Sequence, residues 1–144
     1  MKLLQRKIDN ILKEWKKNEN RLPLIVKGAR QVGKTASILQ FAHSNYKNVV
    51  AINFVLQPKY KAIFEEGYEV DDIIRNLTLI DPSLKIEPTN TLIFFDEMQD
   101  CPACATSLKA FKIDGRYDVI CSGSLMGINY REIESNSVGY KEDY

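Results

Sequence analysis

Apolar residues are grouped along this chain in two ways, and the two patterns alternate. Short apolar runs occupy residues 22–26 and 91–95, and strand-forming residues also dominate 48–54 and 117–121. Such runs are typical of strands buried on both faces of a parallel sheet. The segments between them repeat apolar residues at steps of three and four, which indicates helices. The alternation predicts an α/β domain with helices on both faces of a mostly parallel sheet.

Residues 1–20 predict an N-terminal amphipathic helix ahead of a core that spans 21–144. Its apolar positions recur at helical spacing, with charged residues between them: Leu4, Ile8, Ile11, Leu12 and Trp15. The helix could pack on the core, or it could lie on a membrane or a partner. Acidic Asp9 and Glu14 on its polar face count against a membrane.

A phosphate-binding motif lies between the first predicted strand and the helix that follows. Residues 28–35 fit G-x-x-x-x-G-K-[ST], whose glycines let backbone N–H groups surround a phosphate. Lys34 would add a positive charge for the β- and γ-phosphates, and Thr35 a hydroxyl for Mg²⁺. The predicted nucleotide-binding residues are Gly28, Ala29, Arg30, Gln31, Val32, Gly33, Lys34, Thr35 and Ala36. Arg21 and Leu22, just before the strand, are candidate contacts for the nucleotide base.

Two carboxylates follow the apolar run at 91–95. Ligands of open α/β sheets bind beyond the carboxyl ends of the strands, so Asp96 and Glu97 should emerge beside the phosphate-binding loop. Asp96 suits a Mg²⁺ ligand, and Glu97, one residue further, suits the group that orients or deprotonates an attacking water. The alternative is an acidic loop that caps the next helix.

Small polar residues follow the strand predicted at 117–121. A hydroxyl at the tip of this strand would be placed to sense a γ-phosphate. Ser124 is the first choice and Ser122 the second, and the alternative is a solvated serine turn.

The composition of the chain limits its expected partners and cellular compartment. The chain has 144 residues with 20 basic and 19 acidic side chains, a net charge of +1 that indicates no nucleic-acid partner. No apolar run approaches the roughly 20 residues of a membrane span, and the N-terminus lacks the apolar block of a signal peptide. Three cysteines without an export signal predict a cytoplasmic protein. Cys101 and Cys104 form a C-x-x-C pair, which we expect to be ordinary reduced thiols, although a redox role stays open.

Three segments together resemble the prokaryotic AAA-type ATPases with an AAA_14 core and a C-terminal DUF4143 domain. They are residues 28–35, Phe-Phe-Asp-Glu-Met-Gln-Asp at 94–100 and Cys-Ser-Gly-Ser-Leu-Met at 121–126, within a likeness that covers roughly 15–140. The resemblance implies a three-layer P-loop fold with strand order 1-4-3-2. It also implies hydrolysis of Mg-ATP, with these residues at matching positions: Lys34, Thr35, Asp96, Glu97, Gln99 and Ser124.

The same resemblance leads us to expect that parts of the family's fold are missing from this sequence. Members of that family are longer, so we expect the sequence to stop before the fifth strand and the lid, which would leave the first strand at a sheet edge. Neither Arg116 nor Arg131 lies in a pattern that marks an arginine finger. The functional prediction is ATP binding and hydrolysis by the core of a larger ATPase, whose expected partners are a second copy of the chain or a missing C-terminal domain. The alternative is a switch or remnant that binds ATP without turnover. A P-loop kinase is a third hypothesis, against which the carboxylate pair at 96–97 counts.

Overall fold

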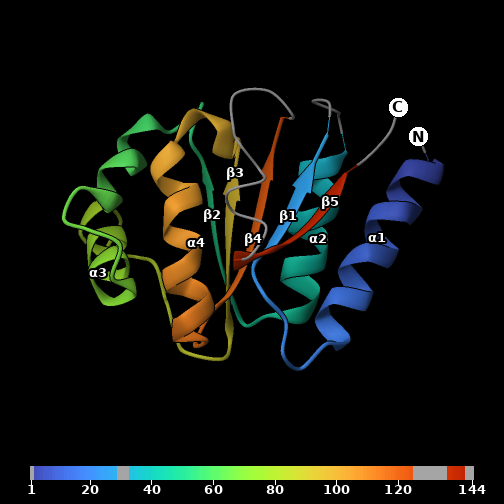
Figure 1. The fold of residues 1–144 in the computed structure, drawn as a ribbon, viewed down its shortest axis with the longest axis horizontal. Coiled ribbons are helices and arrows are strands. Elements are labelled where there is room, and N and C mark those ends of the chain that lie inside the picture. Colours follow the sequence, from blue (N-terminus) through green and yellow to red (C-terminus); the bar gives the residue numbers. More distant parts are fainter. Residues whose placement is uncertain (1, 29–32, 125–135, 142–144) are drawn as a thin grey trace.

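A five-stranded parallel sheet forms the centre of the molecule (Figure 1). The computed structural model describes residues 2–28, 33–124 and 136–141. Its strands lie in the order β2-β3-β4-β1-β5, and every neighbouring pair is parallel. The elements, with η for short 3₁₀ helices, are α1 (Lys2–Lys17), β1 (Leu24–Lys27), α2 (Lys34–Asn45), β2 (Asn48–Asn53), η1 (Pro58–Phe64), α3 (Val70–Ile80), β3 (Thr91–Asp96), η2 (Met98–Asp100), α4 (Pro102–Asp114), β4 (Asp118–Gly123) and β5 (Val138–Lys141). The α/β class and the predicted order of the first four strands are confirmed.

The expectation that the chain stops before a fifth strand is wrong. β5 pairs with β1 in parallel, from Leu24 beside Val138 to Lys27 beside Lys141. The Val138 amide also donates to the carbonyl oxygen of Pro23 at 2.8 Å. β1 is therefore an internal strand, held by β4 on one side and by β5 on the other.

The two faces of the sheet are covered by different helices (Figure 1). α1 and α2 pack on one face, where alternate strand residues share a core with Ile38 and Ala42 of α2. η1, α3 and α4 pack on the other face. The side-chain alternation of the strands explains this division, because Leu92 and Phe94 of β3 join the first core, whereas Ile93 and Phe95 join the second.

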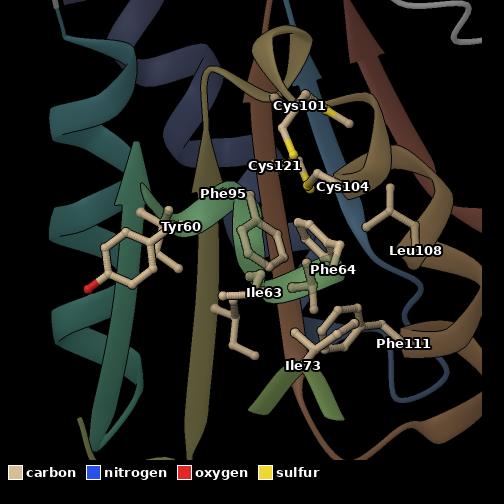
Figure 2. Packing of buried hydrophobic residues seen from close by; sticks show 14 of the residues in the cluster. Tyr60, Ile63, Phe64, Ile73, Phe95, Cys101, Cys104, Leu108, Phe111 and Cys121 are labelled. Carbon is tan, nitrogen blue, oxygen red and sulfur yellow. The ribbon is translucent and has the colours of Figure 1, made fainter. Parts of the chain in front are cut away.

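Phe95 lies at the centre of the second core (Figure 2). Its ring stacks on that of Phe54, with centroids 5.6 Å apart, and contacts Phe64 and Phe111 at 6.0 and 6.2 Å. Aromatic pairs at such distances stabilise a core beyond the area that they bury. These contacts join the end of β3 to η1 and α4, so the position where β3 leaves the sheet is firmly held.

α1 packs on the core, as the first interpretation of residues 1–20 predicts. Ile8, Leu12 and Trp15 are buried against α2 and the sheet. The Trp15 indole also donates a hydrogen bond to the carbonyl oxygen of Leu22 at 2.7 Å, which ties the helix to the chain just before β1. No helix within the described residues combines the length and apolar character that crossing a membrane requires.

The prediction that Arg21 could contact a nucleotide base is not supported by its position. Its guanidinium donates to Asp118, the first residue of β4, at 2.7 and 2.9 Å. Tyr46 donates to the same carboxylate. Asp118 begins its strand and Arg21 precedes β1, so this cluster lies at the amino edge of the sheet, opposite the edge where the strands end at Lys27 and Asp96.

Candidate functional site

α2 is the first helix after β1 along the chain, with residues 28–33 between the two elements. α2 starts at Lys34, and the residue before it, Gly33, has φ 110° and ψ −27°. A side chain is strongly disfavoured in this conformation, which explains the second glycine of the motif. Lys34 is only 6% exposed. Gly28 is buried, and its amide donates to the carbonyl oxygen of Gly123 at 3.3 Å, which joins the ends of β1 and β4.

Four of the predicted phosphate-binding residues lie outside the described part of the chain: Ala29, Arg30, Gln31 and Val32. The described members of the set are Gly28, Gly33, Lys34, Thr35 and Ala36, and Ala36 is exposed on the first turn of α2. The amides at the start of a helix carry partial positive charge, so this turn favours an anion.

Asp96 and Thr35 meet at the carboxyl edge of the sheet. Asp96 ends β3 and follows the alternation of Leu92 and Phe94, which places its side chain on the face that α2 covers. The Thr35 hydroxyl donates to Asp96 Oδ2 at 2.8 Å. The carboxylate is 6% exposed. Two residues separated by 61 positions, each predicted to contact Mg²⁺, are therefore hydrogen-bonded to each other.

The other carboxylate oxygen of Asp96 is also bound. The hydroxyl of Ser122, on the neighbouring strand β4, donates to Asp96 Oδ1. The backbone amide of Glu97 donates to the same oxygen at 2.9 Å. Ser122 is completely buried. Three groups from α2, β4 and the chain after β3 thus hold one carboxylate.

Glu97 leaves the sheet in a left-handed conformation, with φ 58° and ψ 46°. Residues other than glycine, asparagine and aspartate rarely adopt this region, and such strain concentrates at functional sites. The turn at Glu97 directs the chain into η2, so the side chain is half-buried and does not continue the alternation of β3.

Ser124, the first choice for a phosphate-sensing hydroxyl, lies just beyond the end of β4. Its side chain is half-buried, and its backbone amide donates to Gln99 Oε1 at 3.1 Å. Gln99 therefore ties the segment after β3 to the segment after β4. Arg116 is committed elsewhere, because it pairs with Asp71 and Asp114 at 2.6 and 2.7 Å, and Arg131 lies outside the described residues.

The residues at this edge fit a small divalent cation. A threonine hydroxyl beside a nearly buried carboxylate offers two of the hard oxygen ligands that Mg²⁺ prefers. Among the described residues, no group of three or more His, Cys, Asp or Glu side chains could hold a metal by itself. Mg²⁺ commonly retains waters and binds substrate phosphates beside one or two protein ligands, so the pair is sufficient for that mode.

The three cysteines lie together in the second core, below this edge (Figure 2). All three are free and buried. Burial raises the pKa of the Cys101 thiol and raises that of Cys104 well above its ordinary range. A raised pKa disfavours the reactive thiolate, so Cys101 and Cys104 behave as apolar packing groups.

A groove of about 420 Å³ lies elsewhere, between the start of α3 and the outer side of α4. Tyr68, Lys109 and Ile113 contribute to its lining. None of its lining residues is a predicted nucleotide contact, so the hydrogen-bonded side chains around Asp96, rather than this hollow, define the candidate site.

A parallel sheet with a glycine-led helix start beside the tip of an acidic strand defines the class of P-loop nucleotide-binding domains. A family model described as an AAA domain, AAA_14, matches residues 20–144. The chain therefore belongs to this AAA family.

Solved structures agree on the fold. PCH-2 of C. elegans is 15% identical, with a TM-score of 0.51, and the match covers 98% of this chain and 42% of PCH-2. The Holliday junction branch migration motor RuvB of Thermotoga maritima is 12% identical, with a TM-score of 0.56 and coverage of 97% and 45%. A variant of that RuvB gives 14% identity and a TM-score of 0.55, with coverage of 100% and 45%. This chain thus spans less than half of each structure. A search of curated proteins found no match.

Proposed function

We propose that this chain binds Mg-ATP and hydrolyses it to ADP and phosphate as the nucleotide-binding core of a larger ATPase. The observation that carries the proposal is the hydrogen bond between Thr35 and Asp96, which unites the two halves of the predicted site. Family membership supports the nucleotide, and the fit of a hydroxyl and a carboxylate to a hard cation supports magnesium.

The roles of the protein groups follow from their charge and position. The amides of the segment from Gly28 to Ala36 bind the phosphates, aided by the dipole of α2. Lys34 compensates the charge of the β- and γ-phosphates. Thr35 and Asp96 would hold Mg²⁺, which would neutralise charge that develops on the phosphates.

Glu97 would act on the water and Ser124 on the γ-phosphate. A carboxylate at this position can orient the attacking water and accept its proton. The strained turn at Glu97 supports this role, because backbone strain concentrates at functional sites. Ser124 would report the γ-phosphate through its hydroxyl, on a segment held to Gln99.

Binding is tested first, with a fluorescent ATP analogue and Mg²⁺. Lys34→Ala should weaken binding by roughly 10- to 100-fold, because hydrogen bonds to charged groups contribute about 1.5–3 kcal/mol. Lys85→Ala removes an exposed lysine from the loop before β3 and serves as the matched control, with unchanged binding. No binding by the unaltered chain, or equal binding by all three proteins, would refute the proposal.

Turnover is tested separately, by phosphate release. Glu97→Gln should retain nucleotide binding and lose hydrolysis, whereas Glu65→Gln, an exposed control, should retain both. If the unaltered chain binds ATP without releasing phosphate, the alternative of a nucleotide-binding switch without turnover is correct instead.

The proposal extends to the organisation of the whole protein. Residues 1–20 form an N-terminal helical element, and residues 21–144 form the nucleotide-binding core. We also infer a cytoplasmic, prokaryotic protein with a DUF4143-type partner domain and a capacity for self-association. The three reduced cysteines support the reducing compartment, and the likeness at 28–35, 94–100 and 121–126 supports the relationship.

A further inference from the structure

The Ser122 hydroxyl is placed beside Asp96 by the register of the sheet. In the register of β3 and β4, Phe95 lies opposite Cys121. The next residues, Asp96 on β3 and Ser122 on β4, are therefore neighbours across the two strands. Ser122 also lies opposite Val26 of β1. Paired residues of parallel strands point to the same face, here the face of α2. Ser122 is therefore enclosed between the strand that enters α2 and the strand that ends in Asp96.

The two carboxylate oxygens of Asp96 accept hydrogen bonds from different groups. Oδ1 accepts from the Ser122 hydroxyl and from the Glu97 amide, which together occupy the two lone pairs of a carboxylate oxygen. Oδ2 accepts from Thr35, the other predicted Mg²⁺ contact. Donors on both oxygens prevent the carboxylate from rotating, so Oδ2 stays directed toward Thr35.

The same bond leaves Ser122 unsuited to sensing a phosphate. A serine hydroxyl has one proton to donate, and that of Ser122 is given to Asp96. Its side chain is 0% exposed. A γ-phosphate oxygen would need a donor at the surface of the site.

We propose that Ser122 is a positioning residue, which fixes Asp96 so that Oδ2 is presented with Thr35 to a divalent cation. This inference rests on the proposed function. Groups that hydrogen-bond to a metal-ligating carboxylate commonly change metal affinity by about 10- to 100-fold when they are removed. The role predicts a defect in the use of Mg²⁺ that does not depend on the γ-phosphate.

The test measures binding of a fluorescent ADP analogue while Mg²⁺ is titrated, with a parallel measurement in EDTA. Ser122→Ala should raise the Mg²⁺ concentration for half-maximal effect by about tenfold or more and leave binding in EDTA within about twofold. A phosphate-sensing role for Ser122 predicts instead a normal Mg²⁺ requirement with ADP and a defect confined to ATP. That second result would overturn the inference.

Ser107→Ala is the matched control. Ser107 is also 0% exposed and donates its hydroxyl to the carbonyl oxygen of Cys104 at 2.6 Å, within α4. This variant loses a buried hydroxyl and should keep the normal Mg²⁺ requirement. If Ser122→Ala does not fold, Ser122→Cys supplies a weaker donor of similar volume and should show the same direction of change.

The outcomes separate the two levels of the proposal. If the unaltered chain binds no nucleotide, the proposed function fails and this inference fails with it. If the unaltered chain binds ADP with a clear gain from Mg²⁺ and Ser122→Ala or Ser122→Cys shows the same gain, only the role of Ser122 is refuted.

Discussion

The left-handed turn at Glu97 makes a quantitative prediction about stability and activity together. Glu97 has φ 58° and ψ 46°, and Thr89, in the turn before β3, has φ 71°. A left-handed conformation costs an ordinary residue about 1–2 kcal/mol, whereas glycine adopts it freely. The greater conformational freedom of glycine in the unfolded chain offsets part of this benefit, by about 0.4–1 kcal/mol. Each change to glycine should therefore stabilise the protein by about 0.5–1 kcal/mol.

The backbone contacts of both residues survive the substitution. The Glu97 amide donates to Asp96 Oδ1 at 2.9 Å, and the Thr89 amide donates to the carbonyl oxygen of Arg116 at 2.8 Å. Neither bond uses the side chain that is removed. Relief of strain should thus raise the melting temperature by about 1–4 °C in a domain of this size.

Three variants separate strain from charge in urea unfolding and phosphate-release assays. Glu97→Gly should gain stability and lose hydrolysis. Glu97→Gln keeps the strained backbone, so it should lose hydrolysis without the gain. Thr89→Gly should gain stability and keep hydrolysis, since it lies at the opposite end of β3. Equal stability of the glycine and glutamine variants at position 97, or no gain at position 89, would refute the assignment of strain to these turns.

Three further changes test the site and its support. Gly33→Ala should destabilise the protein by about 1–3 kcal/mol and weaken nucleotide binding, because φ of 110° disfavours a side chain, as paired unfolding and titration experiments would show. Leu12→Ala should lower the free energy of unfolding, measured in urea, by about 2–5 kcal/mol, since the Leu12 side chain of α1 is fully buried in the core that α1 shares with α2 and the sheet. Tyr46→Phe should cost about 1.5–3 kcal/mol near pH 8 through the lost bond to Asp118. Burial and this bond raise the pKa of Tyr46 above its ordinary 10.0, so its contribution is complete below pH 10 and declines at higher pH. Urea midpoints of both proteins should therefore converge above pH 10, and a constant difference would contradict this.

The local pattern of the sequence predicts most of the sheet but not its last strand. The runs at 22–26 and 91–95 correspond to β1 and β3, because strands buried on both faces need apolar residues at every position. β5 has only four residues, Val-Gly-Tyr-Lys, and its glycine and lysine give no apolar run. β5 forms because the free edge of β1 can pair with it. Pairing with a strand that is distant in the sequence leaves no signal in the local pattern of residues.

The position of Arg21 could have been predicted from topology. Residues that precede a parallel strand lie at the opposite edge from those that follow it, so Arg21, before β1, cannot share an edge with Lys34. Asp118 begins β4 at the same edge as Arg21 and supplies its partner. The prediction was based on the place of the segment before the first strand in other P-loop ATPases, and here β1 separates Arg21 from the edge where the phosphate motif begins.

The choice between Ser122 and Ser124 depends on register, which the sequence does not specify. Both serines lie near the tip of β4, and either could be assigned to a phosphate from its position alone. Phe95 opposite Cys121 makes Ser122 the neighbour of Asp96 on the face of α2. A shift of one residue would turn the hydroxyl toward α4 and leave the Asp96 carboxylate with one donor fewer. The packing of Phe95 against Phe54, Phe64 and Phe111 opposes a one-residue slip of β3, because the slip would move the Phe95 ring out of this aromatic core. The aromatic core on one face of the sheet therefore fixes the geometry of the acidic site on the other.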